Sequence, residues 1–215
     1  LYGPAMDTHR NAYCGRNFEY LSEDPLLAGE LGAGYVEGIQ SQGVGASVKH
    51  FLANNQEMRR MDSSSEMDER TMREIYMPAF ERIVKRVNPW TVMAAYNKVD
   101  GVHCTQNGSL LNDLLCGEWG FGGLVISDWG ATHDRVAAVR AGCALTMPGE
   151  SLSDADIVAA VQGGNLDEAA LDACCVKVVS LALMVERERH RAGRVRTFDF
   201  ERGHVLSRRI ASQSM

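Results

Sequence analysis

The sequence contains no cluster of basic residues and no long hydrophobic run. Its 215 residues include 22 lysines and arginines against 28 aspartates and glutamates, a net charge of −6 at pH 7. Surfaces that bind nucleic acid are strongly basic, so this balance excludes nucleic acid as an expected partner. The longest apolar stretches, such as residues 176–185, are too short and interrupted to cross a bilayer, and we expect no membrane contact.

Several motifs with well-defined chemistry are also absent. The 21 glycines form no G-x-G-x-x-G after an apolar run and no G-x-x-x-x-G-K-[ST], so a phosphate-binding loop is not indicated. G-x-S-x-G does not occur, which excludes the usual nucleophile turn of serine hydrolases. The aspartates, glutamates and histidines show no metal-ligand spacing, and we expect neither a metal nor an organic cofactor.

The six cysteines form no C-x-x-C pair and have no histidine at zinc-ligand spacing. Their even number leaves disulfides open, but the adjacent Cys174 and Cys175 fall inside an apparent helix, and buried free thiols are the expected state. This cysteine usage favours a reducing compartment such as the cytoplasm, while the location itself stays unknown from sequence.

Short apolar runs alternate with helical patterns along the first 150 residues. The expected strands span residues 1–7, 44–51, 91–96, 124–127 and 143–147. Helical patterns between them span residues 25–41, 68–84, 107–116 and 129–140. This alternation predicts βαβ units around a parallel sheet. About five strands are visible against the eight of a closed (β/α)8 barrel, so we expect an open or incomplete sheet.

The pattern becomes helical after Pro148-Gly149 and stays so to about residue 192. The charged run 186–196 and the polar tail that follows predict an exposed linker. We therefore expect three parts: a barrel domain over residues 1–150, helices that close it over 151–192, and a linker over 193–215.

The apolar run 124–126 ends at Ser127-Asp128-Trp129, where a carboxylate and an indole follow a buried strand. The carboxyl ends of strands are where α/β folds collect ligands and catalytic groups. A carboxylate beside an indole suits a sugar site, because the ring covers apolar C–H faces and the carboxylate attacks or stabilises an anomeric carbon. The alternative is that Asp128 only caps the following helix. This segment alone does not decide between the two.

Polar side chains follow other apolar runs as well. Lys49 and His50 end the second run and can both hydrogen-bond sugar hydroxyls, although for an isolated pair a surface lysine and a buried structural histidine are the favoured explanation. Tyr96 ends the third run, and its phenol is expected at the same edge. Arg16 can offer a planar set of donors to vicinal hydroxyls. If these strand ends share one edge, their side chains surround one site.

Six segments occur in a fixed order along the chain: GRNFEYLSEDP (15–25), KHFLANNQExxR (49–60), DERTMREIYMPAFE (68–81), VMAAYNKVDG (92–101), NDLLCGEWGFGGLVISDWG (112–130) and AGCALTMPG (141–149). Together they closely resemble the N-terminal barrel domain of glycoside hydrolase family 3, in its β-glucosidase branch, over residues 1–190. The resemblance implies a (β/α)8 TIM-type barrel, incomplete at its N-terminal side here, with a C-terminal helical or linker tail. The loop 57–68 contains no histidine, which argues against the N-acetylglucosaminidase branch.

The resemblance also implies a role for each matching position. Asp128 corresponds to the nucleophile that forms a covalent glycosyl-enzyme, and Trp129 flanks the sugar in the −1 subsite. Four further matching residues are expected to bind the substrate: Arg16, Lys49, His50 and Tyr96. Glu57 and Arg60 match a supportive E-x-x-R, although their spacing alone explains them as a local ion pair.

The resemblance finally implies that catalysis needs groups outside these residues. In two-domain members the acid/base glutamate belongs to a following α/β-sandwich domain, and an aspartate that binds the −1 sugar lies upstream. We expect retaining hydrolysis of terminal non-reducing β-D-glucosyl residues from a β-glucoside or short β-linked oligosaccharide, with the sandwich domain of the same polypeptide as partner. The alternatives are a β-xylosidase or broad-specificity β-glycosidase, or a catalytically inactive sugar-binding fragment.

Overall fold

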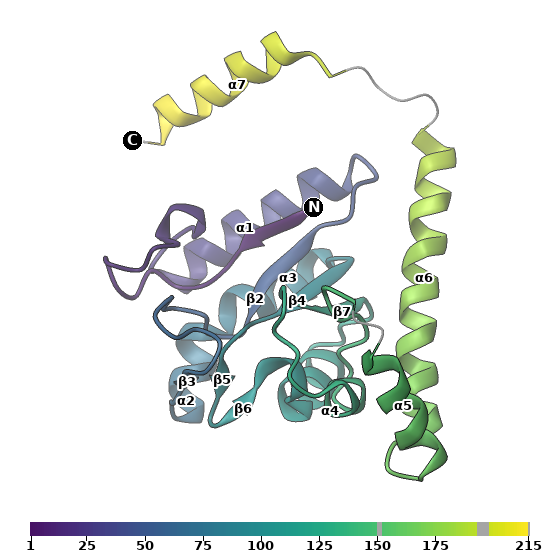
Figure 1. The fold of residues 1–215 in the computed structure, drawn as a ribbon. Helices are drawn as coiled ribbons and strands as arrows, with labels where there is room; N and C mark the ends of the chain where they lie inside the picture. The colour runs from purple at the N-terminus through teal and green to yellow at the C-terminus, as the bar shows by residue number, and fades with distance from the viewer. Residues whose placement is uncertain (150–151, 193–197, 215) are drawn as a thin grey trace.

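A sheet of four parallel strands forms the centre of the protein (Figure 1). The computed structural model describes residues 1–149, 152–192 and 198–214. The strands follow the order β1 (Tyr2–Ala5), β2 (Ser47–Phe51), β4 (Thr91–Ala94) and β7 (Leu124–Ser127). Each strand is added on the same side of the one before it, as in a barrel, whereas a doubly wound sheet reverses direction. The predicted parallel α/β architecture is therefore confirmed.

The fifth expected strand is reduced to a single bridge. Within residues 143–147 only Leu145 pairs with the sheet, in parallel with Ile126 of β7. A second, small sheet joins three segments of two residues each, which are too short to give a periodic signal in the sequence. Its strands are β3 (Ser64–Ser65), β5 (Lys98–Val99) and β6 (Val102–His103).

Helices connect the strands of the central sheet. Helix α1 (Pro25–Gln40) begins where the sequence predicts, because the Asp24 side chain accepts hydrogen bonds from the N–H groups of Leu26 and Leu27. The remaining elements before β7 are η1 (Asn17–Glu19), α2 (Glu69–Thr71), η2 (Met72–Tyr76), α3 (Pro78–Val87), η3 (Cys104–Gln106) and η4 (Ser109–Glu118). The expected continuous helix over 68–84 was thus wrong: it widens into the π-type turn η2 and restarts at Pro78, which has no N–H to continue the ladder.

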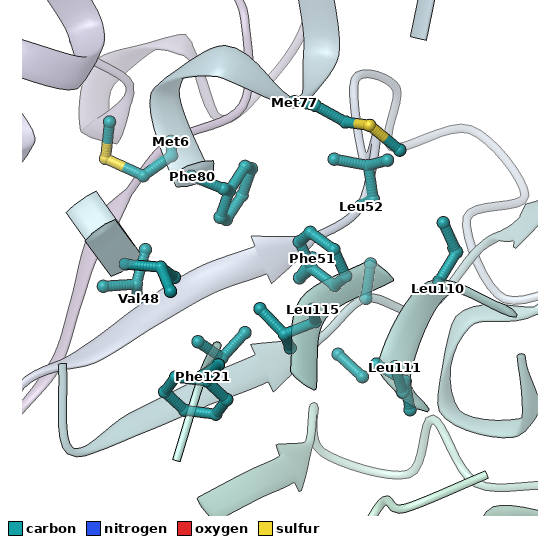
Figure 2. Close-up of a cluster of buried hydrophobic side chains, with 14 of the residues drawn as sticks. Met6, Val48, Phe51, Leu52, Met77, Phe80, Leu110, Leu111, Leu115 and Phe121 are labelled. Atoms are coloured by element: carbon teal, nitrogen blue, oxygen red, sulfur yellow. The ribbon is translucent and has the colours of Figure 1, made fainter. Parts of the chain in front are cut away.

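The main core lies between the central sheet and the helices on one of its faces (Figure 2). Val48 and Phe51 of β2 point into it, and the Phe51 ring meets the edges of Phe80 and Trp119 at centroid distances of 5.3 and 5.8 Å. The opposite face of β4 and β7 packs against α6 through a smaller apolar cluster: Met93, Leu124, Ile126, Val178 and Leu181. Both faces of these strands are covered, as continuous apolar runs require.

The C-terminal part is helical, with α4 (Arg135–Arg140), α5 (Leu152–Gln162), α6 (Glu168–Ala192) and α7 (Phe200–Gln213). Helix α6 ends at Ala192, as the sequence predicts, but one detail of the expected linker was wrong: α7 forms there, with Asp199 as its N-cap. Helix α7 buries no residue, so this segment is exposed as expected. Residues 193–197, which belong to the same expected linker, lie outside the described residues. None of the helices described is long and apolar enough to cross a membrane.

Candidate active site

Asp128 lies directly after β7, and its side chain is nearly buried. Its backbone N–H donates to Ala94 O at 3.0 Å, and its Oδ1 accepts from the Trp129 N–H at 2.7 Å. Its other oxygen, Oδ2, accepts no hydrogen bond within the described part of the chain. The expected helix over 129–140 was wrong at its start, because Asp134 caps α4 by accepting from the Ala137 N–H at 2.9 Å. Asp128 is therefore not a helix cap.

His50 lies between Asp128 and a second buried carboxylate. Its Nε2 is 3.5 Å from Asp128 Oδ2, and its Nδ1 is 2.9 Å from Asp7 Oδ2. The Arg16 guanidinium reaches the same Nε2 at 2.7 Å. His50 is 1% exposed, so these neighbours rather than water set its hydrogen bonds.

Glu19 joins Arg16 to Lys49. Arg16 Nε donates to Glu19 Oε1 at 2.6 Å, and Lys49 Nζ lies 2.9 Å from Glu19 Oε2. Burial by itself raises the pKa of Glu19, but the hydrogen bonds and charges of Lys49 and Arg16 outweigh it and lower that pKa. Burial likewise opposes the charge of Arg16, but Glu19 outweighs it and raises the Arg16 pKa. Lys49 therefore pairs with Glu19, and the shifts keep Arg16 and Glu19 charged.

A second chain of contacts connects Arg16 to Tyr96. Arg16 Nη1 is 3.9 Å from Glu57, whose other oxygen accepts from Arg60 at 2.5 Å. The Arg60 guanidinium in turn lies over the Tyr96 ring, 4.4 Å from its centroid. Burial and then the negative charge of Asp128 raise the pKa of the Tyr96 phenol. Glu57 and Arg60 do form the local ion pair that their spacing predicts, and the pair also supports Tyr96.

The structure thus brings together the side chains that the sequence singled out, with one exception. Trp129 is 62% exposed, and none of the contacts described above involves its indole, although its backbone N–H donates to Asp128. Two residues of the cluster were missed from sequence: Asp7 and Glu19. Asp7 lies two residues after the end of β1 and is the last residue of the strand expected over residues 1–7, so its place at a strand end was an available signal.

Two histidines stack on each other, His103 at the end of β6 and His133 in the loop before α4. The rings of His103 and His133 are 3.9 Å apart at an angle of 27°. Burial and then the charge of His133 lower the pKa of His103 below its ordinary value of 6.5. His133 and Gly130 also line a cavity of about 590 Å³. None of the side chains that cluster around Asp128 and His50 lines this cavity.

This histidine pair predicts a pH dependence of stability. Below about pH 6.5 the unfolded chain binds a proton at His103 before the native state does, so the free energy of unfolding is expected to fall as the pH drops towards the native pKa. Urea unfolding between pH 5 and 8 measures this slope. His103→Gln is expected to flatten it, whereas His204→Gln on α7 is a matched control that leaves the stacked pair intact. An unchanged slope in His103→Gln would contradict the prediction.

The described residues contain no group of three or more histidines, cysteines, aspartates or glutamates that could hold a metal ion. All six cysteines are free, and burial raises the pKa of the Cys104 and Cys143 thiols to about 12.

Residues 1–181 match the model of the glycosyl hydrolase family 3 N-terminal domain. The chain is 46% identical to thermostable beta-glucosidase B of Acetivibrio thermocellus, over all of this chain and 28% of that protein. It is 51% identical to an exo-alpha-(1->6)-L-arabinopyranosidase of Bifidobacterium longum, over 84% of this chain and 24% of that protein. The chain thus spans about a quarter of the length of these relatives.

Solved structures of beta-glucosidases are similar to this chain as well. A GH3 beta-glucosidase of Bifidobacterium adolescentis superposes with a TM-score of 0.88 at 47% identity, over 93% of this chain and 29% of that one. Beta-glucosidase 3B of Thermotoga neapolitana, in complex with glucose, gives a TM-score of 0.85 at 45% identity, over 89% of this chain and 28% of that one. These values extend the similarity to nearly all of the described fold.

Proposed function

From the premise that this chain belongs to glycosyl hydrolase family 3, we propose that it forms part of the barrel domain of a retaining β-glycosidase acting on terminal β-D-glucosyl residues. One observation carries the proposal: Asp128 presents an unpartnered carboxylate oxygen at the carboxyl end of a barrel strand, among Arg16, His50 and Tyr96. A carboxylate so placed is suited to attack an anomeric carbon from one face of a sugar.

The proposed reaction proceeds in two displacements. Asp128 Oδ2 attacks the anomeric carbon while the bond to the leaving oxygen breaks and that oxygen takes a proton from a general acid. A water molecule, deprotonated by the same group, then attacks the anomeric carbon, releases Asp128 and retains the configuration. Arg16, Lys49 and His50 bind sugar hydroxyls, and the raised pKa of Tyr96 keeps its phenol protonated and able to donate.

None of the other clustered carboxylates suits the proton donor. A general acid needs a raised pKa, but Arg16 and Lys49 lower that of Glu19. Glu57 is held in its ion pair with Arg60, and Asp7 accepts three hydrogen bonds. We therefore propose that the general acid comes from a second domain of the same polypeptide. Residues 1–150 then supply the nucleophile side of the site, 151–192 close the barrel domain, and 193–215 lead on to that domain.

A substrate panel on the complete polypeptide tests the sugar specificity. We expect the highest kcat/KM for p-nitrophenyl β-D-glucoside, with the β-D-xyloside and the α-L-arabinopyranoside as comparisons. The xyloside lacks the hydroxymethyl group, and the arabinopyranoside also has the opposite configuration at C4. The arabinopyranosidase similarity at 51% identity makes this sugar the second candidate. If kcat/KM is higher for the α-L-arabinopyranoside than for the β-D-glucoside, the arabinopyranoside replaces the glucoside as the proposed substrate.

Trp129 is proposed to cover an apolar face of the bound sugar. Trp129→Ala is expected to raise KM by about ten-fold, because a ring contact of this kind contributes about 0.5–1.5 kcal/mol beyond its buried area. Its 62% exposure predicts little change in thermal stability. The matched control is Trp119→Phe, a change at a buried indole in the core, which is expected to lower Tm and leave KM unchanged. An unaltered KM in Trp129→Ala would contradict this role.

A further inference from the structure

We propose that Asp7 is a positioning residue that fixes the tautomer of His50 and thereby lets Nε2 of His50 accept a hydrogen bond from Arg16. The inference rests on the proposed role of Arg16 and His50 in binding sugar hydroxyls, and it adds a residue that acts on Arg16 only through His50. It is carried by the hydrogen bonds around the two ring nitrogens.

Asp7 is built to accept hydrogen bonds from the end of β2. Its side chain is fully buried, and its Oδ2 accepts from the backbone N–H of His50 at 3.1 Å as well as from the ring at Nδ1. Its Oδ1 accepts from the Asn54 N–H at 2.9 Å. The carboxylate therefore holds the backbone and the ring of His50 together, which orients the imidazole as well as anchoring it.

The opposite ring nitrogen faces a group that can only donate. Arg16 Nη2 lies 2.7 Å from His50 Nε2, and a guanidinium has no acceptor. Nε2 must therefore offer its lone pair, and the ring hydrogen lies on Nδ1, where it donates to Asp7. The two partners together specify a neutral imidazole with one defined tautomer.

This tautomer has a consequence for Arg16. With its lone pair on Nε2, His50 accepts from Arg16 Nη2, while Glu19 accepts from Arg16 Nε, so the guanidinium is held between two acceptors. A hydrogen on Nε2 would instead face a group that can only donate, and Arg16 would have to turn away. By holding the hydrogen on Nδ1, Asp7 keeps Arg16 in place in the site.

Kinetics of variants in the complete polypeptide test the proposal. Asp7→Asn keeps the side-chain shape but places an amide N–H₂ among groups that donate, so the tautomer is no longer fixed. We expect kcat for an aryl β-glucoside, and the rate of covalent labelling by 2,4-dinitrophenyl 2-deoxy-2-fluoro-β-D-glucoside, to fall together by about 10- to 100-fold, as for other residues that orient a catalytic group. The matched control is Asp24→Asn, since Asp24 also accepts two backbone N–H groups but lies at the start of α1.

A double-mutant cycle separates positioning from a purely structural role. If Asp7 acts through His50, adding Asp7→Asn to His50→Gln is expected to cause little further loss of kcat. The same fold-loss in both backgrounds would overturn the proposal. So would an effect of Asp24→Asn on the labelling rate as large as that of Asp7→Asn.

The tautomer can also be measured without any variant at Asp7. In the complete wild-type polypeptide labelled with ¹⁵N-histidine, with His50→Gln to assign the signal, we expect Nδ1 to resonate as a protonated nitrogen and Nε2 as an unprotonated one. A protonated Nε2 would overturn the proposal even if Asp7→Asn did not fold. The NMR result does not depend on the chemistry of Asp128, so a failure of the proposed function, seen as full activity in Asp128→Asn, remains distinguishable from a failure of this inference.

Discussion

Asp128→Asn in the complete polypeptide is expected to lower kcat for an aryl β-glucoside by about 10⁴-fold or more, as the removal of a catalytic nucleophile does. Asparagine keeps the size of the side chain and can still accept from the Trp129 N–H, so the loop after β7 is expected to keep its shape. What is lost is the negative oxygen that bonds to the anomeric carbon. The effect therefore falls on kcat and on covalent labelling, with little change in Tm.

The control for this variant lies on the same loop. Asp134→Asn removes a carboxylate that caps α4 by accepting from the Ala137 N–H, and asparagine is an equally good cap. We expect near wild-type kcat from it. Mass spectrometry of wild-type enzyme trapped with the 2-fluoro-glucoside is expected to find the sugar on the peptide that contains Asp128. A loss of less than about 100-fold in Asp128→Asn, or a label on another peptide, would contradict the assignment.

The central sheet could be predicted because its signals are local. The run 124–127 coincides with β7. The other main strands lie inside their predicted ranges but are shorter than predicted. The late start of β2, at Ser47 within the predicted range 44–51, has a physical cause. A Cβ on Gly45 would meet the Trp90 ring at 2.4 Å, so the chain there is shaped by a close approach to a distant residue. Local patterns find the strand but not such an approach.

The start of α4 shows where local signals compete. Asp128 and Asp134 are both plausible helix caps in sequence, and the choice is made by contacts from another part of the chain. Gly130 adopts φ +81°, a conformation that favours glycine, and its N–H donates to Met147 O at 2.7 Å. Residues 128–131 therefore form a turn, closed by the Ala131 N–H, which donates to Asp128 O at 3.1 Å, and the helix begins only after its cap, Asp134.

The positions of the site residues could be predicted, but their pairing could not. Each lies near a strand end, and parallel strands place those ends at one edge. The contact of Asp7 with His50 joins residues 43 positions apart, and no periodicity reports it. Lys49 pairs with Glu19 and lowers the pKa of that carboxyl, although the sequence analysis did not single Glu19 out. Charge partners within a cluster are set by side-chain geometry, which only the assembled fold defines.

The 215-residue chain by itself is expected to be nearly inactive on p-nitrophenyl β-D-glucoside. The loss of a general acid alone accounts for about 10²- to 10⁴-fold in rate. The clustered carboxylates cannot replace it, because Glu19 and Glu57 are paired with cations and Asp7 is occupied by donors. Steady-state rates of the chain and the complete polypeptide, measured side by side, check this. Turnover by the chain that is lost on Asp128→Asn would contradict it.

Three states of the isolated chain can be told apart. In the described sheet β2 is the one strand that pairs with β1, and the other edge of β1 carries a single bridge, from Ala5 to Tyr20. Such a largely open edge favours association or loosening. Helical far-UV circular dichroism without fixed near-UV signals would identify a loose fragment. A folded chain that binds glucose but takes no label from the 2,4-dinitrophenyl 2-fluoro-glucoside would be a sugar-binding module. We expect a third result, slow labelling at Asp128 without turnover, because this leaving group departs without a proton and needs only the nucleophile that the chain holds.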